Sequence, residues 1–189
     1  MDKPEVKKIL IGITGHKQSG KDTVANYLAN KYQFKQYAFA NPLKNIARCS
    51  FNLTEEQLNG KEKEMKDSYW GYTPRYIMQI IGDLMRNDLT KYMPELKSDF
   101  FVKCFQHEYQ LSQSNNFVVS DVRFMNEAKI VSESGGMIIK VIRKTADEVK
   151  DQHISETEME KIKYNFLIKN DETLEELYQK VDKIIQIFK

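Results

Sequence analysis

The sequence predicts a three-layer α/β fold, in which helices cover both faces of a central, mainly parallel sheet of five strands. Short apolar runs rich in β-branched residues alternate with segments of helical periodicity. Residues 116–142 in particular contain a strand, a helix, a glycine turn and a second strand, which is a βαβ signature. The 189 residues suffice for one sizeable core, so we expect a single domain over 1–189.

The amino-terminal part of the chain predicts a strand, a helix, a strand and a helix in turn. Residues 8–14 (KILIGIT) form an isoleucine-rich run that stops at a glycine, as expected for a strand buried on both faces. Apolar residues have helical spacing over 22–32, and a short strand is expected over 36–40. A helix over 42–51 has a proline in its first turn, where a missing N–H costs nothing.

The middle of the chain has the least regular pattern. Residues 52–71 are polar and charged, so we expect a mobile helical excursion or loop outside the core. Two helices are expected after it, over 75–93 and 98–111.

The last third of the chain returns to α/β alternation. A polar stretch without a clear period covers 144–163, and the closing helix carries one apolar stripe between Leu174 and Phe188. That helix begins with a capping box of Thr173 and Glu176. The expected elements are a strand at 116–120, a helix at 126–134, a strand at 137–142, a strand at 166–168 and the closing helix.

Composition excludes several classes of partner. The chain has 29 Lys and Arg against 27 Asp and Glu, and a net charge of +2 is too small to attract nucleic acid or a membrane in bulk. A charged amino terminus and the lack of a long apolar segment predict a cytoplasmic protein. Cys49 and Cys104 match neither a metal site nor a disulfide framework, so we expect both to be buried packing residues.

Residues 15–23 (GHKQSGKDT) have the glycine spacing and the lysine of a Walker A loop, between a predicted strand and a predicted helix. Glycines allow backbone N–H groups to wrap a polyanion at close range, and the lysine brings a positive charge to the outer phosphates. The alternative, a tight turn without a ligand, is disfavoured because the spacing, the lysine and both flanks agree. We therefore expect ATP to bind Gly15, Lys17, Ser19, Gly20, Lys21, Asp22 and Thr23.

Asp22 departs from the general motif. It follows the lysine where a Ser or Thr usually coordinates Mg²⁺, and the hydroxyl arrives one residue later, at Thr23. Asp22 or Thr23 could therefore hold the metal, while a helix N-cap role for Asp22 is the alternative.

Asp121 and Arg123 follow an apolar strand, at the end where ligands of open α/β sheets bind. Asp121 is a candidate for holding Mg²⁺ through water, and Arg123 for gripping a phosphoryl group bidentately. A structural Asp–Arg pair is the alternative. Lys21, Asp121 and Arg123 are thus the candidate catalytic residues.

A helical face between 75 and 86 is the candidate wall for the acceptor of the phosphoryl group. Arg75, Gln79, Gly82 and Arg86 fall on one side of a helix, and a glycine inside a helix costs about 1 kcal/mol, which close approach of another group would explain. The alternative is an ordinary solvated face.

A set of motifs in one order resembles the phage-type deoxynucleoside monophosphate kinases, a family of P-loop nucleotide kinases. The resemblance covers about residues 8 to 185 and lacks a match at 52–71, where this chain is shorter than the family. The motifs are 19–23 (SGKDT), 40–44 (ANPLK), 75–88 (RYIMQIIGDLMRND), 119–123 (VSDVR), 153–156 (HISE) and 168–171 (IKND).

The resemblance implies a P-loop fold that phosphorylates deoxynucleoside monophosphates with ATP and Mg²⁺. By resemblance, Lys44 would neutralise the acceptor phosphate, although by itself it fits an exposed helix lysine, and Asn170 could contact adenine or, with Asp171, cap a helix.

We expect an acceptor-binding helical insertion over about 52–112. The polar segment over about 144–163 suits a lid, with Arg143, Lys150 and His153 in or beside it as candidate cations, and a surface residue is the alternative for His153. Trp70 and Tyr72 could stack on a base or form a partly buried aromatic pair. The remaining candidates are Arg143 and Asn170 for ATP, Lys44, Trp70, Arg75, Gln79, Asp83 and Arg86 for the acceptor, and Asp22, Thr23 and Asp121 for the metal.

Other functions fit the sequence less well. Phosphomevalonate kinases share the loop and the Asp-x-Arg strand end, so a related small-molecule kinase is the nearest alternative. A P-loop regulatory module is disfavoured because the sequence has neither the Asn-Lys-x-Asp nor the Asp-x-x-Gly motif of GTPases. A homodimer stays open.

Overall fold

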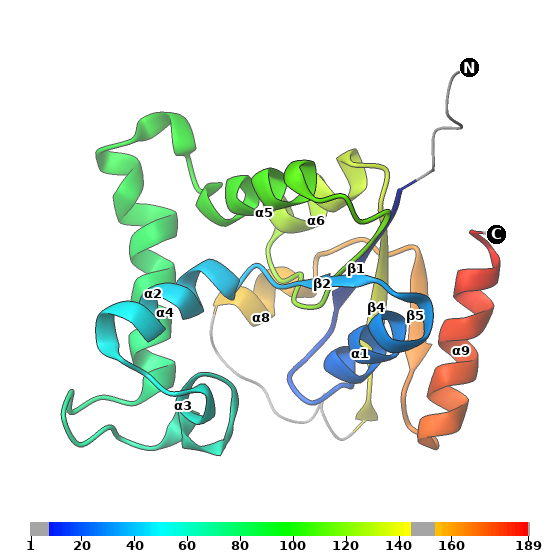
Figure 1. Cartoon of the computed structure of the whole chain (residues 1–189), viewed down its shortest axis with the longest axis horizontal. Helices are drawn as coiled ribbons and strands as arrows, with labels where there is room; N and C mark the ends of the chain where they lie inside the picture. Colours follow the sequence, from blue (N-terminus) through cyan, green and yellow to red (C-terminus); the bar gives the residue numbers. More distant parts are fainter. Residues whose placement is uncertain (1–7, 145–153, 189) are drawn as a thin grey trace. The chain divides into compact units, whose positions relative to one another are not determined.

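A parallel sheet organises the first of two compact units in the computed structural model, which describes residues 8–144 and 154–188 (Figure 1). This unit consists of residues 1–39 and 110–189, and its strand order is β2-β3-β1-β4-β5, with every neighbouring pair parallel. The predicted fold class is confirmed. The strands are β1 (Ile9–Thr14), β2 (Lys35–Tyr37), β3 (Asn116–Val119), β4 (Met137–Ile142) and β5 (Phe166–Lys169).

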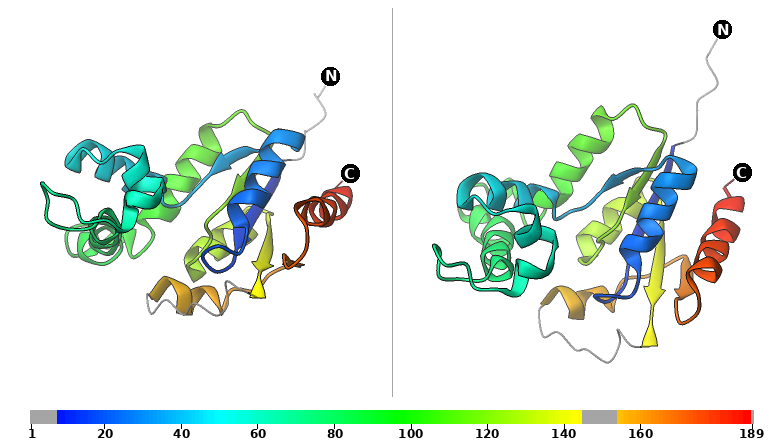
Figure 2. Two further views of the ribbon diagram at one scale, coloured as in Figure 1. Left: turned by 90° about the horizontal axis from the view of Figure 1, so that it is seen from below. Right: turned by 60° about the horizontal axis from the view of Figure 1, so that its bottom comes forward.

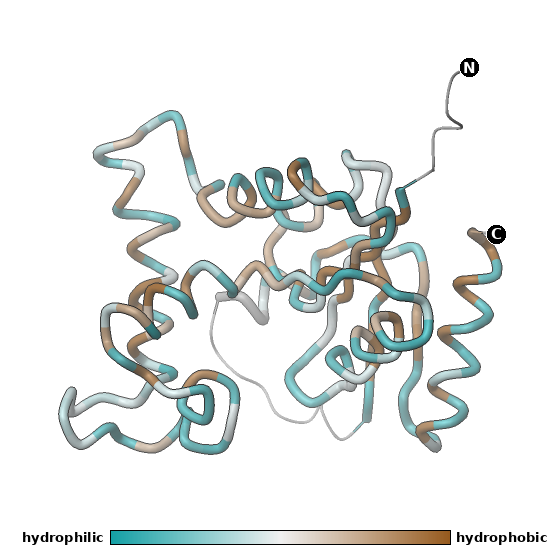
Figure 3. The backbone as a smooth tube through the Cα atoms, viewed as in Figure 1, coloured by the Kyte–Doolittle hydropathy of each residue, from teal (hydrophilic) through white to brown (hydrophobic). Residues whose placement is uncertain are grey.

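Helices cover both faces of this sheet (Figure 2). Ile11 and Ile13 of β1 face a core built with α1 and α9, whereas Gly12 faces the opposite side. A Cβ on Gly12 would lie 3.0 Å from Val122 and 3.2 Å from Val131, so the glycine lets α6 approach the sheet. Apolar and hydrophilic residues alternate along α9, whose buried apolar residues belong to this core (Figure 3). The helices that lie in the described part of this unit are α1 (Lys21–Tyr32), α6 (Met125–Glu133), α8 (Ile154–Met159) and α9 (Leu174–Gln186).

The second unit, Ala40–Tyr109, is helical and has its own core. Leu53 and Leu58 are buried in that core with Ile77, Met78 and Ile81. The expectation of helical structure within 52–71 is confirmed, and Thr54 and Gln57 cap one of its helices reciprocally. The expectation that the stretch lies outside the core is wrong for Leu53 and Leu58. The elements are α2 (Asn41–Phe51), α3 (Glu55–Asn59), η1 (Lys61–Glu64), α4 (Pro74–Asp83), η2 (Leu84–Asp88), η3 (Leu89–Lys91), η4 (Pro94–Leu96) and α5 (Phe100–Leu111), whose last residues pass into the first unit.

The predicted single helix over 75–93 is three segments of different pitch. The α-helix ends at Asp83, a π-helical segment covers Leu84–Asp88, and a 3₁₀ turn covers Leu89–Lys91. A π segment changes the angular spacing of side chains, and such segments are frequent at functional sites.

Cys49 is exposed and Cys104 half-buried, so the prediction that both are buried is wrong, and partial burial raises the pKa of the Cys104 thiol. Within the described residues, none of the helices has the length and apolar character that crossing a membrane requires.

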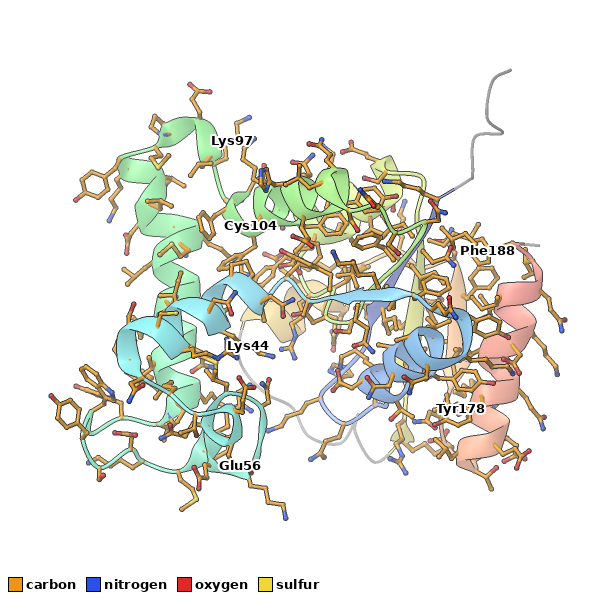
Figure 4. All side chains as sticks on the ribbon, in the orientation of Figure 1. Lys44, Glu56, Lys97, Cys104, Tyr178 and Phe188 are labelled. Carbon is orange, nitrogen blue, oxygen red and sulfur yellow. The ribbon has the colours of Figure 1, made fainter. Side chains whose placement is uncertain are left out.

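A polar cluster joins the first and last helices of the sheet unit. Asp182 of α9 accepts hydrogen bonds from the hydroxyls of Tyr27 (2.9 Å) and Tyr32 (2.7 Å) and from Lys31 Nζ (2.9 Å). Tyr178, which Figure 4 labels on α9, stacks on Tyr27 with ring centroids 3.9 Å apart. Burial by itself raises the pKa of Asp182, but the hydrogen bonds from Lys31, Tyr32 and Tyr27 outweigh it and lower the pKa.

We predict that Asp182→Asn lowers the free energy of unfolding by about 1–2 kcal/mol at neutral pH, because three donors lose an ionised acceptor. The pKa of Asp182 is lower in the folded than in the unfolded state, so its contribution is complete above about pH 4 and is lost as the pH falls further. In urea unfolding, the difference between wild type and variant should therefore shrink towards pH 3.

Glu133→Gln is the control for this measurement. Its exposed carboxylate lies 3.7 Å from the exposed Lys129 on α6, so the change should stay within about 0.5 kcal/mol. A variant difference at position 182 that is the same at pH 3 and pH 7 would contradict the assignment.

Candidate functional site

The loop between β1 and α1 turns sharply at the carboxyl edge of the sheet. Gly15 (φ 144°), Gln18 (φ 66°) and Gly20 (φ 103°) all have positive φ angles. A Cβ on Gly15 would lie 2.1 Å from the carbonyl oxygen of Val141 on β4. Residues with side chains are strained in such conformations, so the turn requires the two glycines. The glycine spacing in the sequence therefore corresponds to the turn that the structure shows.

Lys21 lies at the first residue of α1 and is only 7% exposed. Its Nζ donates a hydrogen bond of 2.6 Å to the carbonyl oxygen of His16, and the backbone N–H of Ser19 donates to the same oxygen at 3.2 Å. An ammonium has three donors, so this contact is compatible with a phosphate contact as well. The buried cation is thereby held against the inside of its own loop.

Two buried hydroxyl groups, at the end of β1 and in the loop, have no hydrogen-bond partner among the described residues. Ser19 Oγ and Thr14 Oγ1 are fully buried and make no hydrogen bond to any described residue. Ser19 Oγ lies 2.9 Å from the place a Cβ of Gly15 would take, so it points back into the loop. Buried hydroxyls are normally hydrogen-bonded, and exceptions are typical of places where a ligand or water binds.

Asn170 supports the loop from the end of β5. Its side-chain Nδ2 donates a 2.8 Å hydrogen bond to the carbonyl oxygen of Ser19, and its backbone N–H donates to Ile142 at 2.8 Å. Thr173 caps α9, so the helix-capping alternative for Asn170 is wrong. Asp171 instead accepts a hydrogen bond of 2.8 Å from the backbone N–H of Lys144.

Asp121 and Arg123 lie in the turn after β3, and β3 is the neighbour of β1, the strand that leads into the loop. Asp121 Oδ1 accepts a hydrogen bond of 2.7 Å from the backbone N–H of Phe39. Sequence reasoning missed Glu127, whose carboxylate is 2% exposed and accepts the N–H groups of Arg123 (2.9 Å) and Phe124 (3.1 Å). Glu127 is the third residue of α6, where a Glu side chain commonly accepts the backbone N–H of the N-cap residue, and this position was the available signal.

The candidate metal ligands next to the loop are Asp22 and Thr23. Gly20 is the N-cap of α1, so the alternative that Asp22 caps the helix is wrong. Asp22 is exposed and Thr23 half-buried in the first turn. Among the described residues, no three His, Cys, Asp or Glu side chains are grouped as an all-protein metal site.

The predicted lid falls partly outside the described residues. Lys150 and His153 belong to 145–153 and cannot be placed, whereas Arg143 is exposed directly after β4. Met159 and Ile162, at the end of the predicted lid, are buried. Lys17, in the loop itself, is exposed.

In the second unit, Arg75 and Arg86 each have a neighbour within that unit. Arg75 Nε donates a 2.6 Å hydrogen bond to Glu64. The guanidinium of Arg86 lies 4.4 Å from the ring centroid of Phe101, and its Nη1 lies 3.3 Å from where a Cβ of Gly82 would be. The glycine within the helix therefore makes room for Arg86. Gln79 is half-buried and Asp83 is exposed on the same helix.

The predicted aromatic pair is not formed. Trp70 donates from Nε1 to the carbonyl oxygen of Phe51 (2.8 Å) and packs edge-on against that ring, while Tyr72 stacks on Tyr76. Lys44 lies half-buried in the first turn of α2 (Figure 4).

Comparison with known proteins identifies one family. Residues 9–71 and 57–181 match the family model described as deoxynucleotide monophosphate kinase. A protein of Acanthamoeba polyphaga mimivirus that provisionally carries the same description is 40% identical over 182 residues, covering 92% of this chain and 94% of its own. The deoxynucleotide monophosphate kinase of Escherichia phage RB69 is 24% identical over 243 aligned positions, covering 94% of this chain and 99% of its own. Because that alignment is longer than this chain, the phage protein contains segments that this chain lacks.

Solved structures agree on the fold. Dephospho-CoA kinase from Campylobacter jejuni superposes with a TM-score of 0.51 at 20% identity, covering 95% of this chain and 96% of that protein. A Thermus thermophilus protein gives a TM-score of 0.50 at 16% identity, covering 97% of this chain and 99% of its own.

The buried Glu127 generates a prediction about the turn that carries Arg123. Glu127→Ala should lower the free energy of unfolding by about 2 kcal/mol, because two buried N–H groups lose their acceptor. Glu127→Gln keeps one oxygen acceptor, so its free energy of unfolding should fall by clearly less than that of Glu127→Ala. Urea denaturation of both variants measures this, and two variants as stable as the wild type would contradict it.

Proposed function

The chain belongs to the deoxynucleotide monophosphate kinase family, and we propose that it transfers the γ-phosphoryl group of ATP to deoxynucleoside monophosphates. The products are ADP and deoxynucleoside diphosphates. The observation that carries the proposal is the loop between β1 and α1, in which Gly15 and Gly20 have positive φ angles and Lys21 is buried. Two buried hydroxyls, of Thr14 and Ser19, have no hydrogen-bond partner among the described residues. In this proposal the first unit binds ATP and the second unit binds the acceptor.

The loop is suited to the triphosphate because its backbone supplies N–H donors at the start of a helix. Lys21 would neutralise the outer phosphates, and the hydroxyl of Ser19 is a further donor inside the loop. Lys17 and Arg143, both exposed, would contact the outer face of the triphosphate. Charge neutralisation and alignment are the main demands of phosphoryl transfer, so these groups match the reaction.

The oxygen donors Asp22, Thr23 and Asp121 fit Mg²⁺. This ion prefers hard oxygen ligands and usually combines one or two carboxylates with substrate phosphates and water, which agrees with a donor set too small for an all-protein site among the described residues. When bound, Mg²⁺ would neutralise charge on the phosphates. Asp121 already accepts the N–H of Phe39, which orients the carboxylate whether or not an ion is present.

We assign the acceptor to residues of the second unit. Arg75, Gln79 and Arg86 would hold its phosphate, with Asp83 and Trp70 near the sugar and base and Lys44 as an additional cation. Arg75 would exchange its ion pair with Glu64 for the dianionic phosphate, which offers more charge and suits the bidentate guanidinium.

In the transfer step, an oxygen of the acceptor phosphate forms a bond to the γ-phosphorus as the bond from that phosphorus to the β-bridging oxygen breaks. The electron pair of the broken bond stays on ADP. Lys21 and Arg123 would stabilise the charge that spreads over the moving group, and the hydrogen bonds to Glu127 hold the backbone that carries Arg123.

The proposal also places the enzyme in the cytoplasm, with nucleotides rather than nucleic acid or a membrane as partners. The net charge of +2 supports this, since it provides no strong field for a polyanion. Whether the protein is a homodimer can be decided by light scattering with and without nucleotides.

A coupled ADP-release assay tests the activity. We predict turnover with at least one of dAMP, dGMP, dTMP and dCMP, and loss of at least about 10³-fold in Lys21→Ala, because the buried cation at the phosphates is removed. Lys129→Ala, an exposed lysine on α6, is the matched control and should keep full activity. The ribonucleotides and phosphomevalonate belong in the same panel, and turnover of phosphomevalonate alone would overturn the assignment of the acceptor.

The acceptor assignment gives a second prediction. Arg75→Ala should raise the KM for the deoxynucleoside monophosphate about tenfold or more and leave the KM for ATP unchanged, because a charged hydrogen bond to the acceptor is lost. Arg48→Ala removes a comparable ion pair, with Glu55 in the same unit, and should change neither constant. Equal effects of the two variants in steady-state kinetics would contradict the role of Arg75.

A further inference from the structure

The carbonyl oxygen of Ser19, in the loop after β1, accepts a hydrogen bond from Asn170, which follows β5. Asn170 lies 151 residues further along the chain, yet its Nδ2 donates to this oxygen at 2.8 Å in a buried contact. The backbone of Asn170 is itself fixed, because its N–H continues the β4–β5 ladder by donating to Ile142. The side-chain amide is therefore aimed at the loop by the sheet.

The contact requires a glycine at the next position of the loop. A Cβ on Gly20 would lie 2.3 Å from Asn170 Nδ2, so any larger residue there would push the amide away. Gly20, the residue after the bound carbonyl of Ser19, also has a positive φ of 103°, which favours glycine. Orientation of the Ser19–Gly20 peptide determines where its N–H group points, and that N–H belongs to the predicted phosphate cradle.

Asn170 is 8% exposed, and its side-chain Nδ2 donates to the backbone of the loop. These contacts favour an action through the loop over direct contact with the adenine ring. Resting on the proposed function, we propose that Asn170 is a positioning residue, which holds the Ser19–Gly20 peptide in the conformation that binds the triphosphate. Its effect on binding is then independent of the base.

The test compares ATP with inorganic tripolyphosphate, which has no base, both with magnesium and by calorimetry. Asn170→Ala should weaken both about tenfold, because a buried carbonyl loses its donor and the loop must be ordered by the ligand. In steady-state assays the KM for ATP should rise while the KM for the acceptor stays unchanged.

Asn170→Asp adds a readout that loss of stability alone does not give. Above the pKa of the new carboxyl it has no donor and carries a negative charge, so binding should be at least as weak as in Asn170→Ala. Burial raises the pKa of such a carboxyl, and once protonated it can again donate to Ser19. As the pH falls from 8 to 5, Asn170→Asp should therefore come to bind tripolyphosphate more tightly than Asn170→Ala at the same pH.

Asn165→Asp is the matched control, at the opposite end of β5. There the side-chain oxygen accepts a hydrogen bond of 2.8 Å from the N–H of Ile138, which a carboxylate can also accept, so binding should match the wild type at every pH. Loss of ATP binding with normal tripolyphosphate binding in Asn170→Ala would indicate base contact and overturn the proposal, as would normal binding of both. A wild-type protein that binds neither ligand would instead refute the proposed function itself.

Discussion

Backbone N–H groups can bind a polyanion where they are not already hydrogen-bonded within a helix or a sheet. The turn from β1 to α1 is such a place, and contacts with neighbouring strands hold its conformation. Gly15 turns against the carbonyl oxygen of Val141 on β4 with no room for a side chain. Asn170, after β5, binds the carbonyl oxygen of Ser19. The loop is thus held from two strands, while Lys21 is held against it from inside. The turn that carries Asp121 and Arg123, the other part of the proposed donor site, follows β3, which pairs with β1 in parallel and ends at this same edge.

The parts of the fold that local chemistry determines could be predicted from the sequence. The run at 137–142 is a strand with the bounds expected, since its residues are apolar except for Lys140, as is typical of a strand inside a parallel sheet. Thr173 and Glu176 form the expected capping box at the start of α9. The glycine spacing of residues 15–20 was equally informative, because positive φ angles at Gly15 and Gly20 are a property of those residues themselves.

Features that depend on distant partners could not be predicted in the same way. The polarity of 52–71 concealed Leu53 and Leu58, whose burial depends on a helical core formed with residues after 74. The π segment after Asp83 leaves no periodic signal, because it alters the spacing only over one turn. Asn170 was identified by resemblance, but its contact with Ser19 follows from the pairing of β5 with β4 and could not be read from either residue alone.

The two halves of the proposed site differ in how they depend on the chain. The donor residues come from turns after four different strands, so their relative positions are determined by the sheet, and the Asp182 cluster that joins α1 to α9 contributes to the stability of that unit. The acceptor residues Arg75, Gln79 and Arg86 come from one short segment, and their spacing is determined by helix pitch and by the room that Gly82 leaves for Arg86. A substitution that destabilises the sheet should therefore weaken the binding of ATP first. A change of helix pitch near Asp83 should instead weaken the binding of the acceptor first. Binding of the two nucleotides can in this way be separated by mutation, even though phosphoryl transfer needs both.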